Sequence, residues 1–181
     1  GPEVGTPFSE SPFDHLLFTG ATGIGQHILH AAADNLTPVT LELGGKSPAI
    51  IGRSADLARA TERVALGKML NAGQICLAPD YMLVPAEEEP RVVEGLKQAA
   101  SAMYPTLLAN PDYTSIVNDR HFQRLNDWLD DSRDKGATID QVNPASEDFA
   151  ATNSRKMPFT IVRDVTDDMI LMQDEIFGPV L

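Results

Sequence analysis

The sequence predicts an α/β protein in which parallel strands pack against flanking helices. Short apolar runs of strand length alternate with longer stretches of helical periodicity, and glycines follow several of these runs. The chain of 181 residues is long enough to bury a core, and its apolar and charged fractions are those of a globular protein. We therefore expect one or two folded domains.

The N-terminal part of the chain has the pattern of one βαβ unit. Residues 1–13 are rich in Pro, Gly and Ser, which predicts a loop. An apolar run at 15–19 predicts a buried parallel strand, residues 24–33 predict a helix, and residues 38–43 predict a second strand. A two-stranded parallel sheet cannot cover its own faces, so we expect this unit to need further segments or to pack on the rest of the chain.

Three glycines, Gly20, Gly23 and Gly25, lie between the first predicted strand and the helix. Their spacing differs from the GxGxxG dinucleotide fingerprint, so the usual Rossmann inference does not apply. Free backbone N–H groups at the start of a helix can bind a phosphate, and a tight turn explains the glycines equally well. Both interpretations stay open at the level of the residues alone.

The remainder of the chain alternates strands and helices less regularly. We expect strands at 47–51, 80–84 and 159–162, and helices at 56–70, 87–103 and 120–135. Residues 71–79 are expected to form a loop that holds the only cysteine. The polar residues 137–153 are expected to be irregular.

The composition excludes several classes of partner. A formal net charge of -12 argues against a nucleic acid, whose phosphates need clustered Lys and Arg, and weakly against an anionic membrane surface. No apolar run approaches the roughly 20 residues that span a bilayer. A single cysteine forms no internal disulfide, so an oxidising compartment is not implied and we expect a cytoplasmic protein.

Cys76 is the first candidate for chemistry. A lone cysteine is usually a small buried apolar residue, but GQIC (73–76) places this one in a loop after an amphipathic helix. Polar, backbone-rich surroundings can stabilise the thiolate, which is the nucleophilic form. A packing role and a catalytic role both stay open.

Glu42 is the candidate base. It lies near the end of an apolar run, directly before Leu43 and the pair Gly44 and Gly45. A carboxylate there is either an edge residue in solvent or a group at the carboxyl end of a parallel strand, where ligands bind in open α/β sheets. Partial burial would raise its pKa and suit a general base. Of the histidines, His27 and His30 could share a helix face but have no third ligand nearby, so we expect no metal site.

Taken together, four motifs resemble the aldehyde dehydrogenase family. FTGATGIG (18–25) resembles the family's turn at the cofactor pyrophosphate and nicotinamide, and LELGGKSP (41–48) is similar to its glutamate signature. NAGQIC (71–76) is similar to its cysteine signature, and DEIFGPVL (174–181) to its cofactor-ribose segment. The order of the motifs and the interval of 34 residues from Glu42 to Cys76 also fit the family.

Within the family, the sequence most resembles the branch that oxidises aromatic and medium-chain or long-chain aldehydes, and there the bacterial coniferyl aldehyde dehydrogenases. The stretches that carry this resemblance are CLAPDY (76–81), MYP (103–105), RHFQRL (120–125) and MQDEIFGP (172–179). The resemblance implies that residues 1–43 are the last βαβ portion of a Rossmann-like NAD(P)-binding domain. Residues 44–181 are then expected to form a catalytic domain, C-terminally incomplete, with a parallel sheet and flanking helices.

The resemblance implies oxidation of an aldehyde to the carboxylic acid with NAD or NADP, of which NAD is favoured. Cys76 is expected to attack the aldehyde carbon, and Glu42 to activate the water that hydrolyses the resulting thioester. Glu175 is expected to hydrogen-bond the nicotinamide ribose and Phe177 to pack beside the nicotinamide. The full set of cofactor-binding residues implied by the motifs is Gly20, Ala21, Gly25, Leu43, Gly44, Glu175 and Phe177.

Some family features have no counterpart in the sequence. Ala21 stands where the family usually has a serine, which puts one hydroxyl contact to the cofactor phosphate in doubt. The family's oxyanion-hole asparagine, its adenine-ribose lysine and its first nucleotide-binding strands are expected to precede residue 1. We therefore expect the chain by itself to bind NAD weakly and to turn over little aldehyde.

Two alternatives to this function stay open. A CoA-acylating or phosphate-reducing relative uses the same cysteine thioester but needs no water-activating carboxylate, so Glu42 argues for hydrolysis. A non-catalytic scaffold or inactive fragment of the same fold is the other alternative. The expected partners are a small aldehyde substrate and, for the full-length protein, a second copy in a dimer, with no nucleic acid and no membrane span.

Overall fold

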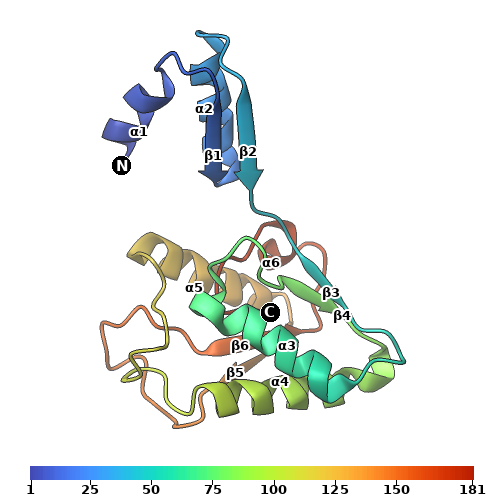
Figure 1. Cartoon of the computed structure of the whole chain (residues 1–181). Helices are drawn as coiled ribbons and strands as arrows, with labels where there is room; N and C mark the ends of the chain where they lie inside the picture. The colour runs from blue at the N-terminus through green and yellow to red at the C-terminus, as the bar shows by residue number, and fades with distance from the viewer. The chain divides into compact units, whose positions relative to one another are not determined.

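The computed structural model describes residue 1 and residues 3–181 in full, and the backbone of residue 2 (Figure 1). The chain divides into two compact units, residues 1–45 (unit 1) and residues 46–181 (unit 2). Each unit combines helices with two-stranded sheets, so the predicted α/β class is confirmed. The bounds of the predicted strands and helices are also confirmed to within about two residues.

Unit 1 contains the predicted βαβ element. Strand β1 (Leu16–Gly20) pairs in parallel with β2 (Val39–Leu43), and helix α2 (Thr22–Ala33) connects them and packs on them (Figure 1). The register places Thr19 opposite Glu42 and Gly20 opposite Leu43. The last residues of both strands therefore lie next to the start of α2.

The prediction of a loop at residues 1–13 is wrong, because helix α1 (Pro2–Ser9) occupies most of that segment. Proline at the first helical positions is compatible with a helix, since its missing N–H would have no intrahelical partner there. Pro7 lies inside the helix but in its second half, and Glu10 still donates its N–H to the carbonyl of Thr6. The Pro and Gly content of the segment was therefore a poor guide to its conformation.

Unit 2 contains the remaining elements. Its strands are β3 (Pro48–Ile50), β4 (Tyr81–Leu83), β5 (Thr138–Val142) and β6 (Phe159–Arg163). Its helices are α3 (Leu57–Met69), α4 (Glu89–Met103), α5 (Asp119–Asp134) and α6 (Ile170–Gln173), with short 3-10 turns η1 (Leu70–Gly73) and η2 (Ala86–Glu88). β3 and β4 pair in parallel, as expected.

Strand β5 was not predicted, and residues 137–153 were wrongly expected to be irregular throughout. β5 pairs antiparallel with β6, so unit 2 does not contain only parallel pairs. Its polar Asp140 is held by ion pairs with Lys97 of α4 and Arg163 of β6. These partners lie far away in the sequence. The polar residues of β5 therefore gave no local indication of a strand.

The core of unit 2 lies on both sides of β6. Phe159 and Ile161 belong to a cluster with buried residues of α3 and α4, while Val162 belongs to a second cluster with buried residues of α5 and the segment after α6. The backbone of residues 179–181 runs parallel to β6, and the N–H of Leu181 donates to the carbonyl of Thr160 at 2.9 Å. The two clusters thus fix α3, α5 and the C-terminal segment around one buried strand.

Candidate functional site

The predicted site residues of unit 1 gather at the carboxyl ends of β1 and β2. Glu42 and Leu43 end β2, and Gly20 ends β1 beside Leu43. A Cβ atom at Gly25 would approach the side chain of Leu43 to 3.2 Å, so the first turn of α2 packs tightly on the end of β2. The structure therefore brings Gly20, Gly25, Glu42 and Leu43 into one neighbourhood.

The N-terminus of α2 fits a phosphate group. Ala21 is the N-cap residue in extended conformation, and no side chain of the described residues caps the helix or places a carboxylate in its first turn. A Cβ atom at Gly23 would meet nothing within 4 Å, so the space in front of this turn is open. Unshielded N–H groups and the positive end of the helix dipole are what an anion such as a cofactor pyrophosphate needs.

Glu42 is exposed in this chain, and so is Gly44, which follows it by two residues. The carboxylate points away from the interior of unit 1, as the alternation of half-buried and exposed residues along β2 indicates. The partial burial expected for a general base is therefore not provided by unit 1 alone.

In unit 2, Cys76 lies in the predicted loop and is exposed. The chain leaves α3 through three consecutive residues with positive φ: Asn71 at 52°, Ala72 at 51° and Gly73 at 72°. This region of backbone space is uncommon for residues other than glycine and persists only where the surroundings enforce it. The strained turn reverses the chain and brings the thiol to the surface rather than into the core.

Gln74 anchors this turn. Its Nε2 donates to the carbonyls of Asn71 and Ser115, each at 3.1 Å, and its Oε1 accepts the N–H of Val117 at 2.9 Å. The side chain is buried, so each of these hydrogen bonds also satisfies a polar group that water cannot reach. The sequence did not single out Gln74, although it stands two residues before the cysteine.

The segment with Glu175 and Phe177 lies directly against the cysteine loop. A Cβ atom at Gly73 would come within 2.2 Å of the carbonyl oxygen of Gly178, so the two backbones are in van der Waals contact. Phe177 adopts a left-handed conformation with φ of 46°. Two motifs that are about a hundred residues apart in the sequence therefore pack against each other in unit 2.

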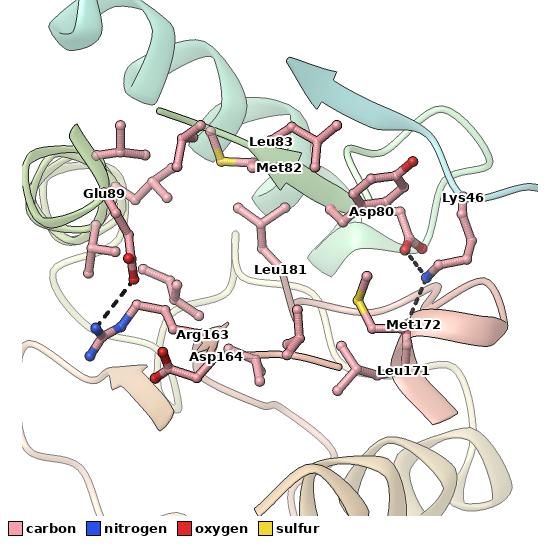
Figure 2. A pocket seen from close by; sticks show the side chains of 18 of the residues that line it. Lys46, Asp80, Met82, Leu83, Glu89, Arg163, Asp164, Leu171, Met172 and Leu181 are labelled. Atoms are coloured by element: carbon pink, nitrogen blue, oxygen red, sulfur yellow. Dashed lines mark hydrogen bonds and ion pairs between the residues drawn. The ribbon is translucent and has the colours of Figure 1, made fainter. Parts of the chain in front are cut away.

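Three charged residues that the sequence analysis did not assign to the site hold this segment. Lys46 pairs with the buried Asp80 and donates to the carbonyls of Leu171 and Asp174, and Asp80 accepts the N–H of Ile176 (Figure 2). Arg124 donates to two further carbonyls of the segment. Lys46 and Asp80 occur inside the quoted motifs LELGGKSP and CLAPDY, but nothing local indicates that they meet.

A buried lysine lies beside this group. Burial lowers the pKa of Lys68 from 10.5 to about 8, and the charge of Asp80 opposes part of that effect. Lys46 lowers the pKa of Lys68 further and Glu175 raises it. The protonation of Lys68, on the helix that leads to the cysteine loop, therefore depends on the charges of Asp80, Lys46 and Glu175.

A cavity of about 720 Å³ opens between β4 and β6 (Figure 2). Lys46 and Asp80 lie at one end of it, and the ion pair of Glu89 with Arg163 lies at the other. Cys76, Glu175 and Phe177 are not among the described residues that line it. The cavity is therefore separate from the exposed thiol, and its lining is mostly apolar side chains of β4, α4 and β6.

The structure thus groups the predicted site residues in two sets. Gly20, Ala21, Gly25, Glu42, Leu43 and Gly44 lie in unit 1, and Cys76, Glu175 and Phe177 lie in unit 2. Each unit is determined by itself, so the expected approach of Glu42 to Cys76 stays a prediction. Within unit 2, an exposed thiol that follows a fixed turn is suited to nucleophilic attack on a bound carbonyl group.

No group of three or more His, Cys, Asp or Glu residues among the described ones could hold a metal ion. Among the same residues, no helix has the length and apolar character required to cross a bilayer.

Comparison with known proteins gives consistent results over the whole chain. The model of the aldehyde dehydrogenase family matches residues 1–181. The chain is 56% identical over 181 residues to the probable coniferyl aldehyde dehydrogenase of Caulobacter vibrioides, a match that covers 100% of this chain and 37% of that relative. The chain therefore spans little more than a third of the length of this relative.

Solved structures agree with this result. The substrate-bound state of Staphylococcus aureus AldH is similar with a TM-score of 0.88 and 37% identity, covering 100% of this chain and 38% of that one. The NAD+ complex of an aldehyde dehydrogenase from Bacillus cereus is similar with a TM-score of 0.84 and 32% identity, covering 100% of this chain and 37% of that one. The α/β architecture described above is thus that of these enzymes.

Proposed function

The chain belongs to the aldehyde dehydrogenase family, and from this premise we propose that the whole protein carrying it oxidises an aldehyde to the carboxylic acid with NAD or NADP. One aldehyde, one oxidised cofactor and one water give one acid, one reduced cofactor and one proton. The observation that carries the proposal is the strained turn of residues 71–73, which packs against Gly178 and leads to Cys76 at the surface three residues later.

In the first stage, the thiolate of Cys76 attacks the aldehyde carbon and forms a C–S bond, and the carbonyl oxygen becomes an oxyanion. The backbone N–H of Cys76 is a donor for that oxyanion. A bound nicotinamide would supply the hydride acceptor for the former aldehyde carbon, and Cys76 would then carry a thioester.

In the second stage, Glu42 removes a proton from a water molecule that attacks the thioester carbon. The C–S bond breaks, the acid leaves, and Cys76 returns to its starting state. This step requires unit 1 to bring the exposed carboxylate of Glu42 toward the exposed thiol of Cys76. Both side chains are accessible in their own units, which favours such an approach.

Cofactor binding is proposed for both units. Gly20, Ala21 and Gly25 form the start of α2, where the open space at the helix N-terminus suits the pyrophosphate. Leu43 and Gly44 lie beside this turn at the end of β2, and Glu175 and Phe177 are proposed to hold the nicotinamide riboside. NAD is favoured over NADP because the similar Bacillus cereus enzyme is an NAD+ complex.

The substrate is proposed to be an aromatic aldehyde such as coniferaldehyde, or a medium-chain or long-chain aldehyde. The name of the Caulobacter vibrioides relative supports the aromatic choice. We further propose that residues 1–43 complete a cofactor domain and that residues 44–181 belong to the catalytic domain. The whole protein is proposed to be a cytoplasmic homodimer.

The proposal is tested with the whole protein and two of its variants, on coniferaldehyde and on a straight-chain aldehyde with each cofactor. Cys76→Ser is expected to abolish reduction of the cofactor. Glu42→Gln is expected to retain one rapid turnover and then to slow by about 100-fold or more, because hydrolysis has lost its base. Glu62→Gln, which changes an exposed carboxylate on α3, is the matched control and is expected to be active.

The products distinguish this function from the nearest alternative. Acid release that depends on Glu42 and not on CoA supports hydrolysis. Full activity of Cys76→Ser would contradict the proposal, and formation of acyl-CoA at a rate independent of Glu42 would identify a CoA-acylating enzyme instead.

A further inference from the structure

We propose that Lys46, Asp80 and Arg124 are positioning residues that fix the backbone around Glu175 and so set the affinity of the protein for its dinucleotide. The inference rests on the proposed function, since it assigns the cofactor to the Glu175 segment. It concerns residues that touch neither the thiol nor the reacting carbon.

Lys46 and Asp80 bind the segment from one side. Nζ of Lys46 donates to the carbonyl of Leu171 at 2.7 Å and to that of Asp174 at 3.0 Å, and it forms an ion pair with Oδ1 of Asp80 (Figure 2). Oδ2 of Asp80 accepts the N–H of Ile176 at 2.8 Å. Glu175 therefore lies between the carbonyl of Asp174, which is bound by Lys46, and the N–H of Ile176, which is bound by Asp80.

Arg124 binds the same segment from α5. Nη1 donates to the carbonyl of Glu175 at 3.3 Å and Nη2 to that of Ile176 at 2.6 Å. Its guanidinium lies 4.3 Å from the ring centre of Trp128, one turn further along the helix, which restricts its orientation. Both carbonyls are thus held by a planar group that is itself held in place.

Burial makes these contacts strong. Asp80 is only 2% exposed, and the side chain of Lys46 is 18% exposed. Hydrogen bonds from charged groups to the backbone are about twice as strong as neutral ones, and loss of one partner leaves a buried group without compensation. Asn at position 80 keeps one oxygen that can accept a hydrogen bond, but it has neither the charge nor the second oxygen, so it cannot hold both Lys46 and the N–H of Ile176 as Asp80 does.

The segment has little other local structure to fix it. Helix α6 before it has a single turn, and Phe177 after Ile176 adopts the left-handed conformation with φ of 46°. Such a conformation persists only when the surrounding contacts impose it. The three charged side chains supply contacts on both sides of Glu175, and so they determine where its carboxylate and the ring of Phe177 lie.

The test compares Asp80→Asn and Arg124→Gln with Asp140→Asn in the whole protein. Asp140 is the matched control, because it is also a partly buried carboxylate with two cationic partners, Lys97 and Arg163, in the same unit. The readouts are the Kd for NAD and for NADP from calorimetry, the rate of alkylation of Cys76 by iodoacetamide without cofactor, and the thermal midpoint.

Asp80→Asn and Arg124→Gln are each expected to raise the Kd for the preferred dinucleotide by about tenfold, the effect of one lost charge-assisted hydrogen bond. Alkylation of Cys76 is expected to stay within about twofold, because the hydrogen bonds of Gln74 that hold the cysteine turn involve neither Asp80 nor Arg124. Asp140→Asn is expected to leave the Kd unchanged even where the thermal midpoint falls. If Asp80→Asn does not fold, Arg124→Gln still carries the test.

Two results would overturn the inference: an unchanged Kd in folded Asp80→Asn and Arg124→Gln, or an equal rise in Asp140→Asn, which would indicate general loosening of unit 2. In either case, aldehyde oxidation that depends on Cys76 would leave the proposed function standing. Absence of any NAD or NADP binding by the unsubstituted protein would instead remove the proposed function and the inference with it.

Discussion

Unit 1 and unit 2 are built from the same kinds of element but bury very different amounts of apolar side chain. In unit 1, Leu16 and Ala32 are the buried apolar side chains among the described residues, whereas unit 2 has two clusters of buried residues around β6. Several large apolar side chains of unit 1 are exposed instead, namely Val4, Phe8, Leu17, Ile24, Leu29 and Leu36. Unit 2 therefore has a core of its own, whereas unit 1 leaves most of its large apolar side chains without a partner surface inside the unit.

The two units also differ in their content of Lys and Arg. Unit 1 contains no Lys or Arg, and all 14 basic residues of the chain lie in unit 2. Unit 2 uses several of them to bind backbone carbonyls, as Lys156 does with those of Leu107, Leu108 and Asn110. Unit 1 fixes its loops with neutral side chains instead: Asn35 donates to the carbonyl of Glu10 at 2.7 Å and Thr37 to that of Phe13 at 3.0 Å.

The largest expected effect is on independent folding. Ordering a residue costs about 1–2 kcal/mol of backbone entropy, and burying one large apolar side chain contributes about 1.5–3 kcal/mol. Two buried side chains cannot offset that cost in unit 1. A peptide of residues 1–45 is therefore expected to lack a cooperative thermal transition by circular dichroism, whereas residues 46–181 are expected to unfold cooperatively.

A cooperative transition of the 1–45 peptide would contradict this view of unit 1. A 46–181 fragment whose amide signals are poorly dispersed in NMR would contradict the view of unit 2 as a unit with its own core.

The second effect is on single side chains. Phe159 is fully buried in unit 2, and Phe159→Ala is expected to lower the free energy of unfolding by about 3–5 kcal/mol because a cavity remains. Leu17 is 66% exposed on β1, and Leu17→Ala is expected to change stability by less than about 0.5 kcal/mol. Urea denaturation of the whole chain followed by circular dichroism measures both.

Similar losses in the two variants would show that unit 1 buries Leu17 in solution. A small loss in Phe159→Ala would mean that β6 does not hold the core of unit 2.

The same contrast explains which predictions from the sequence succeeded. The βαβ element and the helices of unit 2 follow from local patterns: α3 has an N-cap at Asp56, and α5 has one at Asn118. Strand β5 and the role of Asp80 do not, because Asp140 and Asp80 are satisfied by partners far away in the sequence. The motif resemblance supplied the site residues, but the residues that hold them were visible only in three dimensions.

The third effect is on the pH dependence of stability and also belongs to unit 2. Burial lowers the pKa of Lys68 from 10.5 to about 8, against the opposing charge of Asp80. Between these pH values the unfolded chain binds more protons at this residue, so Lys68 makes stability rise as pH increases from about 8 to about 10.5. Below pH 8 the buried charge costs about 3 kcal/mol.

Lys68→Met is therefore expected to raise the midpoint of urea unfolding at pH 7 and to flatten its increase between pH 8 and pH 10. Lys97→Met, in which the lost lysine is partly exposed and paired with Asp140, is the control and is expected to retain the slope. An unchanged slope in Lys68→Met would show that this lysine is not the group that titrates.

The smallest effect has opposite signs in the two units. Gly73 has φ of 72° and its Cβ would lie 2.2 Å from the carbonyl oxygen of Gly178, so Gly73→Ala is expected to destabilise unit 2 by about 2 kcal/mol through backbone strain and overpacking. Gly23 lies in α2 with open space around it, and Gly23→Ala is expected to favour that helix by about 0.5–1 kcal/mol.

Because the cysteine turn and the Gly178 backbone are in contact, Gly73→Ala is also expected to change the alkylation rate of Cys76, whereas Gly23→Ala is not. Equal alkylation rates in the two variants would show that the strained turn does not affect the reactivity of the thiol.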